Sequence, residues 1–154
     1  MAIGPDEIYD RIVTGIEARL GSSVVAAADG PWRVSRHSWD HFRELRDSRT
    51  IAHHSFAVGM PVGDGTIAAR QHAGVGNLTR EDLSIRWAHR LRADAMSADY
   101  QAALAAEVLL VAALKSIDTL AIRVGTRHER IVTPDERTFI GEVRGTLIHY
   151  YPLA

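Results

Sequence analysis

The stretch SIRWAHRLRADAMSADYQAALAAEVLLVAAL, residues 84–114, changes its periodicity once and predicts a strand followed by a helix. In its first part, apolar residues such as Ile85 and Trp87 alternate with polar and basic ones, a period of two that indicates a half-buried strand. After a polar turn, Ser97 is expected to cap a helix that runs to about Ile117. A strand joined to a helix in this way already favours a mixed fold.

The predicted helix is apolar on more than one side. Its main buried stripe is expected to consist of Tyr100, Leu104, Val108, Val111 and Leu114. Alanines fill most of the other positions and leave room for a close neighbour. We therefore expect the sheet to cover one side of this helix and a second helix or a second subunit to cover another.

Three further strands are predicted from the same alternation, over residues 52–62, 120–124 and about 137–151. The first should pair with the strand of residues 83–91 as an antiparallel hairpin, across a long loop expected over residues 63–82. Residues 125–130 are expected to turn the chain. Gly141 and Gly145 share one face of the last strand, where they are expected to make room for a helix.

Residues 5–20 predict a first, amphipathic helix, because Ile8, Ile12 and Ile16 recur every four residues after a proline suited to the first turn. Residues 24–26 are a possible short strand, and residues 38–45 a possible short helix.

Together these elements predict one α+β domain over residues 1–154, with an antiparallel four-stranded sheet (the hairpin plus two C-terminal strands, paired in chain order) packed against two main helices. The predicted core is Phe56, Val58, Ile85, Trp87, Leu104, Val108, Val111, Ile122, Val143 and Leu147.

Composition narrows the class of protein. With 154 residues, 46% apolar residues and a net charge of −1, the chain is typical of one globular domain and not of a general polyanion binder. The absence of cysteine excludes disulfides, a thiol nucleophile and cysteine-ligated metal. No secretory leader is expected, and no membrane span, because the longest apolar run, residues 108–114, is far short of about 20 residues.

Motifs for catalysis are not found. His37, Asp40 and His41 have a spacing that could supply metal ligands, but the glutamate of a zinc protease motif is absent. His53 and His54 are expected to point to opposite faces of a strand and so not to bind one ion together. No nucleophile elbow and no phosphate-binding glycine loop is present. We therefore expect no enzyme activity, no cofactor and no metal.

Basic side chains suggest a contact surface. Arg86, Arg90 and Arg92 are expected on the outer side of the second strand, and Arg70, His72 and Arg80 in the loop before it. These six residues are the candidate partner interface. Two interpretations stay open: an acidic partner binds there, or the charges are solvated and deter edge pairing, with a loop that contacts nothing.

The stretch of residues 84–114, together with HHSFAVGMPVGDG (residues 53–65) and the strands of residues 120–124 and 139–151, resembles the tail terminator, or tail-completion, proteins of tailed bacteriophages. The resemblance covers about residues 50–151 and implies an α+β fold that assembles with copies of itself as a ring, expected to be a hexamer.

Such a ring caps the head-proximal end of the tail tube, stops its polymerisation and offers a surface for head joining. The resemblance thus implies as partners the tail tube protein and a head–tail connector or stopper protein. It implies a virion location after synthesis in the host cytoplasm, no membrane, and passage of DNA without specific recognition. Two alternatives stay open: another connector or neck subunit, and a small α+β enzyme or ligand-binding domain with a pocket around His37, Asp40, His41 and His54.

Overall fold

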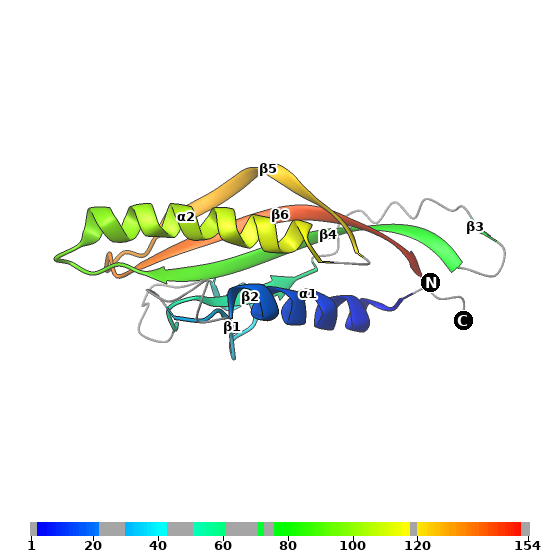
Figure 1. The fold of residues 1–154 in the computed structure, drawn as a ribbon, viewed down its shortest axis with the longest axis horizontal. Coiled ribbons are helices and arrows are strands. Elements are labelled where there is room, and N and C mark those ends of the chain that lie inside the picture. The colour runs from blue at the N-terminus through cyan, green and yellow to red at the C-terminus, as the bar shows by residue number, and fades with distance from the viewer. Residues whose placement is uncertain are drawn as a thin grey trace.

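The computed structural model describes residues 3–21, 30–42, 51–60, 71–72, 76–117 and 120–151. These residues form an α+β fold with two helices, α1 (Pro5–Leu20) and α2 (Met96–Lys115), and a mostly antiparallel sheet (Figure 1). The predicted class is confirmed, but the sheet has six strands and not four. The possible strand at residues 24–26 lies outside the described residues.

The strands follow one another across the sheet in the order β1-β2-β4-β6-β5, and β3 pairs with β4 off this path. Their bounds are β1 Arg33–Val34, β2 Ser55–Gly59, β3 Gln71–His72, β4 Gly76–Arg90, β5 Ala121–Val132 and β6 Thr138–Tyr151. β1 runs parallel to β2, and the other neighbouring strands are antiparallel. The predicted hairpin is confirmed as β2 and β4, with Phe56 opposite Trp87.

The prediction of a loop over residues 63–82 is wrong in its second half. β4 begins at Gly76 and pairs with β6 from Asn77 opposite Tyr151 to Arg90 opposite Thr138. This part of β4 is polar and shows no alternation, but the long neighbouring strand supplies hydrogen-bond partners for its backbone. β3 adds a further short pair. Residues 61–70 and 73–75 lie outside the described residues.

The prediction of a turn at residues 125–130 is also wrong, because β5 is one continuous strand. Val124 pairs with Gly145 and His128 with Val143, so four steps along β5 accompany two steps along β6. This irregularity is a β-bulge, which interrupts the alternation and looks like a turn in the sequence.

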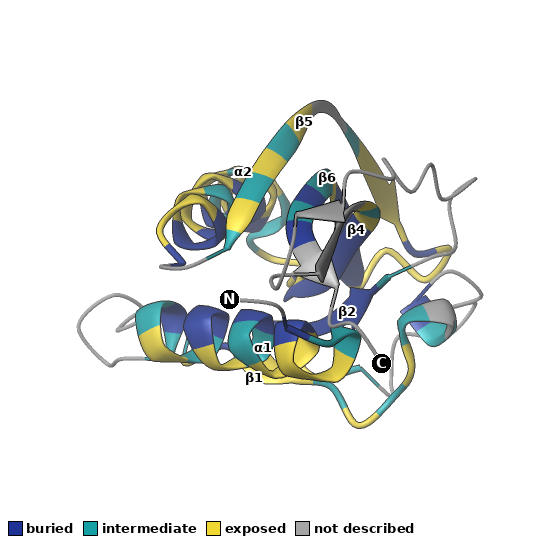
Figure 2. Ribbon diagram, turned by 90° about the vertical axis from the view of Figure 1, so that its right-hand side faces the viewer, coloured by how far each residue is buried: buried dark blue, intermediate teal, exposed yellow. Residues whose placement is uncertain are grey.

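The main core lies between the sheet and both helices, which pack on the same side of β2, β4 and β6 (Figure 2). Its fully buried members include Ile8, Ile12 and Ile16 of α1, Leu110 of α2, and Phe56, Ile85, Trp87, Phe139, Val143 and Leu147 of the strands. The predicted positions Phe56, Val58, Ile85, Trp87, Val143 and Leu147 are confirmed as buried.

The predicted rotation of α2 is wrong. Val108 is 68% exposed, and Leu104 and Val111 are only half-buried. The buried positions are Asp99, Ala103, Ala106, Glu107, Leu110, Ala113 and Leu114. Ile122, in β5, is likewise half-buried. Small alanines allow close helix packing, and two carboxylates turn inward to partners in other elements, so hydrophobicity alone could not place the stripe. The helix begins at Met96, and its N-cap is Ala95 and not the predicted Ser97.

A short 3-10 helix, η1 (Trp39–Phe42), lies against the other face of the sheet and partly confirms the helix predicted at residues 38–45. Phe42 packs there with Ala57, Ala88 and Ile140. Both faces of β2 and of the centre of β4 are therefore buried, where the sequence predicted half-buried strands.

Gly141 makes room for an indole ring and not for a helix. A Cβ at this position would lie 2.5 Å from the ring of Trp87, its partner across the strands. Gly145 meets backbone instead, because its Cβ would lie 2.7 Å from the carbonyl oxygen of Arg123.

Candidate functional site

The outer face of α2 is apolar. Its exposed residues between Asp99 and Lys115 are Tyr100, Gln101, Ala105, Val108, Leu109 and Ala112, none of which is charged. Leu109 is 43% and Tyr100 40% exposed. The exposed side of α1, by contrast, carries Asp6, Glu7 and Asp10. A helix that is apolar toward solvent over several turns is typical of an interaction surface.

The charge that α2 does carry at its centre points inward. Glu107 accepts hydrogen bonds from Arg130 of β5 at 2.9 Å (Nε to Oε2) and 2.7 Å (Nη2 to Oε1), and its Oε1 lies 2.6 Å from His128 Nδ1. Burial by itself raises the pKa of Glu107, but the hydrogen bonds from Arg130 and His128 outweigh it and leave that pKa below its usual range. These contacts fix the rotation of α2 and keep its apolar face outward.

A second carboxylate anchors the start of α2. Asp99 accepts hydrogen bonds from the backbone N–H of Arg92 (2.7 Å) and from its guanidinium (Nη2 to Oδ1, 2.7 Å). The side-chain hydrogen bond from Arg92 lowers the pKa of Asp99 to about 2, despite burial. By length and composition alone α2 is apolar enough to cross a membrane. Its two buried carboxylates and its packing against the sheet show instead the pattern of a helix with one core-facing side.

The strand beside α2 is an edge of the sheet. Among the described strands β5 pairs only with β6, so the backbone groups along its other side face outward. Ile131 and Val132, near the end of β5, are exposed, but Ile131 borders a small pocket with Phe42 and Ile140 and so lies on the η1 side of the sheet, not on the side of α2. We call the outer face of α2 and this edge of β5 together the α2–β5 surface. Unpaired edges with exposed apolar residues are sites at which another chain can add.

The predicted basic interface is divided. Arg80, Arg90 and Arg92 are exposed, but Arg80 and Arg90 stand ten residues apart along β4, or about 33 Å. Arg70 lies outside the described residues, and of His72 only the backbone, in β3, is described. Arg86 is 4% exposed, so its predicted place on an exposed outer face is wrong. The structure therefore brings these residues into no single patch among the described ones.

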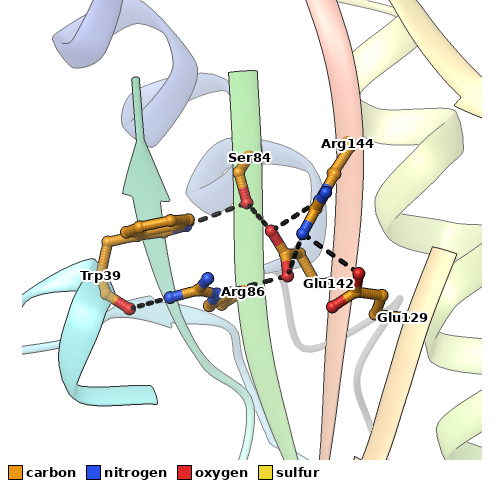
Figure 3. A network of polar contacts seen from close by, with 6 residues as sticks. All are labelled: Trp39, Ser84, Arg86, Glu129, Glu142 and Arg144. Carbon is orange, nitrogen blue, oxygen red and sulfur yellow. Dashed lines mark hydrogen bonds and ion pairs between the residues drawn. The ribbon is translucent and has the colours of Figure 1, made fainter. Parts of the chain in front are cut away.

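Arg86 belongs to a buried polar network that ties η1 to the sheet (Figure 3). Its Nε lies 3.5 Å from Glu142 Oε2, its Nη1 donates to the carbonyl of Trp39 (3.0 Å), and its guanidinium carbon lies 3.4 Å above the Trp39 ring. Ser84 receives a hydrogen bond from Trp39 Nε1 (2.9 Å) and donates to Glu142 (2.6 Å). These contacts hold η1 against β4, so that η1 covers the side chain of Arg86.

The centre of the network is Glu142. Arg144 donates to it from Nε (3.0 Å) and also contacts Glu129 (3.2 Å). Burial raises the pKa of Glu142, but the hydrogen bonds from Arg144 and Ser84 and the charge of Arg86 outweigh it and lower that pKa. Arg86 and Glu142 have opposite charges and lie directly opposite each other on β4 and β6. The sequence alone could not predict this pair, because it does not give the register of the two strands.

A groove beside this network is bordered by several basic side chains. It has a volume of about 600 Å³ and is bordered by Arg80, Arg123 and Arg144 from three neighbouring strands, together with Asp82. Other exposed arginines lie elsewhere: Arg90 and Arg137, for example, line a different cleft of the described part of the chain.

Two groups of histidines appear where the sequence suggested one pocket. The rings of His37 and His41 stack at 4.2 Å. His53 and His54 precede β2 in a turn, and their rings stack at 3.9 Å, so the prediction that they point to opposite faces is wrong. No protein-family model and no curated protein matches the chain, so any proposal of function has to be argued from the sequence and the structure.

Proposed function

We propose that this chain is a structural subunit that assembles with copies of itself into a closed ring and acts as the tail terminator of a tailed phage. The main support for self-assembly is the outer face of α2. It has no charged residue between Asp99 and Lys115, because Glu107 points inward and pairs with Arg130. Removing such a face from water lowers the free energy, so its burial against a neighbouring subunit is favourable.

The two edges of the sheet favour a head-to-tail contact. The α2–β5 surface lies at one edge, and β1, with the exposed Val34, lies at the other edge of the strand order. A contact between two different surfaces forms a ring when its repeated rotation closes, and an open filament when it does not. A contact between two equal surfaces would stop at a dimer, which could not surround a tube.

The role at the end of a tail rests on the resemblance of residues 50–151 to tail terminator proteins, as does the expected six-fold symmetry. At this groove Arg80 and Arg123 offer charge for an acidic surface on the tube or on the head connector, whereas Arg144 is paired with Glu142 and Glu129. In such a contact, charge complementarity sets register and association rate more than affinity.

The experiment is to assemble phage particles without this chain and to measure tail lengths by electron microscopy. Tubes should exceed the normal length and remain unjoined to heads. Wild-type protein supplied in trans should restore length and joining, whereas Val108→Arg should not, because it places a charge in the centre of the α2–β5 surface.

Tyr9→Arg is the matched control, because Tyr9 is an exposed apolar residue on the other helix. It should restore normal tails, and both variants should melt at the wild-type temperature. Tubes of normal length in the absence of the chain would contradict a terminator. If those normal tubes stayed unjoined, the chain would be a neck subunit on the head side.

A further inference from the structure

Three imidazole rings meet between the start of β2 and the end of β4. The ring centres of His53 and His54 are 3.9 Å apart, those of His53 and His89 4.5 Å, and those of His54 and His89 5.2 Å. One ring nitrogen from each lies within 4.8 Å of the others. None of these residues takes part in the α2–β5 surface or in the network of Glu142.

The backbone explains how two consecutive histidines come to lie together. His54 has a φ of 55°, a left-handed conformation that residues other than glycine rarely adopt. Its N–H donates to the carbonyl of Ala88 at 2.8 Å, which fixes the turn against β4 beside His89. Backbone strain of this kind concentrates at functional sites.

We propose that His53, His54 and His89 bind one divalent transition metal ion of the kind that imidazole ligands prefer, with Zn²⁺ as the probe. Nitrogens bound at 2.0–2.1 Å to a tetrahedral ion are about 3.4 Å apart. The three nitrogens lie within 4.8 Å of one another, so binding requires side-chain rotations that shorten this separation and turn the stacked rings of His53 and His54 toward one point. A chain without cysteine has imidazole and carboxylate as its main ligands for such an ion.

The tautomer of His54 suits this role. Its Nδ1 lies 2.9 Å from the carbonyl oxygen of Gly30, to which it can only donate, so in the neutral ring the lone pair is on Nε2. A backbone carbonyl that holds one ring nitrogen is the usual way in which proteins orient a metal-binding histidine.

His53 supplies a specific reporter. The backbone N–H of Arg90 donates to His53 Nδ1 at 2.8 Å. If the metal binds Nδ1, it takes the lone pair that accepts this proton, and if it binds Nε2, Nδ1 becomes protonated. Either way the hydrogen bond breaks, so the amide of Arg90 must change its environment when metal binds.

A cleft gives the ion access. It has a volume of about 580 Å³ and is lined by His53 and by Asp135 and Glu136 of the turn between β5 and β6. Arg90 and Arg137 also line it and balance the two carboxylates, so the cleft is open to an ion but gives it no net electrostatic attraction. We expect a water from the cleft as the fourth ligand. His54 and His89 are 4% and 1% exposed and do not line the cleft, so an ion would reach them only past His53.

The competing explanation is aromatic packing alone, because the ring of Trp32 stacks on His54 at 4.9 Å. Titration of the tag-free chain with ZnCl₂ alone, by calorimetry and by ¹⁵N amide spectra, separates the two. We expect one ion per chain, a shifted Arg90 amide, and at least about tenfold weaker binding in His53→Ala. The combined His37→Ala and His41→Ala variant is the control, because it removes another stacked pair and should bind zinc like wild type.

His53 is only half-buried, so its alanine variant should fold, and the wild-type titration needs no variant at all. Three results would each overturn the proposal. The first is a wild-type chain that takes up no zinc at micromolar free concentration. The second is zinc binding that leaves the Arg90 amide unchanged. The third is binding that survives His53→Ala but is lost in the control variant.

Discussion

Gly141→Ala should destabilise the protein strongly, because the new methyl group has no space. Its Cβ would lie 2.5 Å from Cε2 and Nε1 of Trp87 and 2.7 Å from Cζ2, whereas non-bonded carbons prefer about 3.5–4.0 Å. The indole cannot retreat: it is fully buried, with Trp32 and Phe139 at ring distances of 5.4 and 5.3 Å.

The expected magnitude combines two effects. Overpacking of this kind costs about 3 kcal/mol, and replacing a strand glycine by alanine returns about 0.5–1 kcal/mol of backbone entropy. The free energy of unfolding should therefore fall by about 2 kcal/mol. The measurement is urea unfolding followed by circular dichroism, since the cycle below removes one of the three tryptophans that fluorescence would report.

A double-mutant cycle tests the cause. Trp87→Leu alone should destabilise by leaving a cavity, but in that background Gly141→Ala should cost about 1 kcal/mol or less, because the ring it strikes is gone. Gly15→Ala is the control for additivity: its Cβ would meet Cγ1 of the buried Ile117 at 2.7 Å and not the indole, so its cost should be the same with and without Trp87. Additive effects in the cycle, or a Gly141→Ala protein as stable as wild type, would refute the placement of the indole.

Further predictions concern α2 and pH. Leu110→Ala, at a fully buried position, should cost about 2–5 kcal/mol of unfolding free energy, while Val108→Ala on the outer face should change it by less than about 0.5 kcal/mol; equal urea midpoint shifts would mean that the helix is rotated. The pKa values of Asp99, Glu107 and Glu142 are lowered in the folded protein. Each carboxylate therefore stabilises the fold at pH values above its unfolded-state pKa, and this stabilisation is lost as the pH falls through its folded-state pKa. For Asp99 this window is about pH 4 to 2. Asp99→Asn should flatten the stability loss in that window, and an unchanged slope would contradict it.

Several elements could be predicted because their signals are local. The four-residue repeat of isoleucines determined α1, and the alternation around Trp87 and along residues 138–151 determined the centre of β4 and β6. β1 and β3, of two residues each, carry no periodicity. They are strands only because a neighbouring strand supplies hydrogen-bond partners.

The candidate sites depended on positions far apart in the chain. Alternation placed Arg86 on the face away from the helices, but only the packing of η1 and the register opposite Glu142 made that face buried. The histidines show the same limit: the predicted strand at His53 and His54 implied opposite directions, and the left-handed turn at His54 reversed that conclusion.

The sequence by itself thus determined the class of the fold and its two main helices, because hydrophobic period acts within a few residues. Alternation indicated the long strands but not their order: pairing in chain order was expected, whereas β6 lies between β4 and β5. Only the tertiary structure decided which side of α2 faces water. Leucine, valine and alanine occur on all sides of this helix, so hydrophobicity alone does not indicate which side is buried. The ion pairs of Asp99 with Arg92 and of Glu107 with Arg130 favour the rotation that the structure has. The apolar side of α2 faces outward because the charge of Glu107 is paired on the inner side. This arrangement exists only in the folded protein, since His128 and Arg130, the partners of Glu107, come from β5.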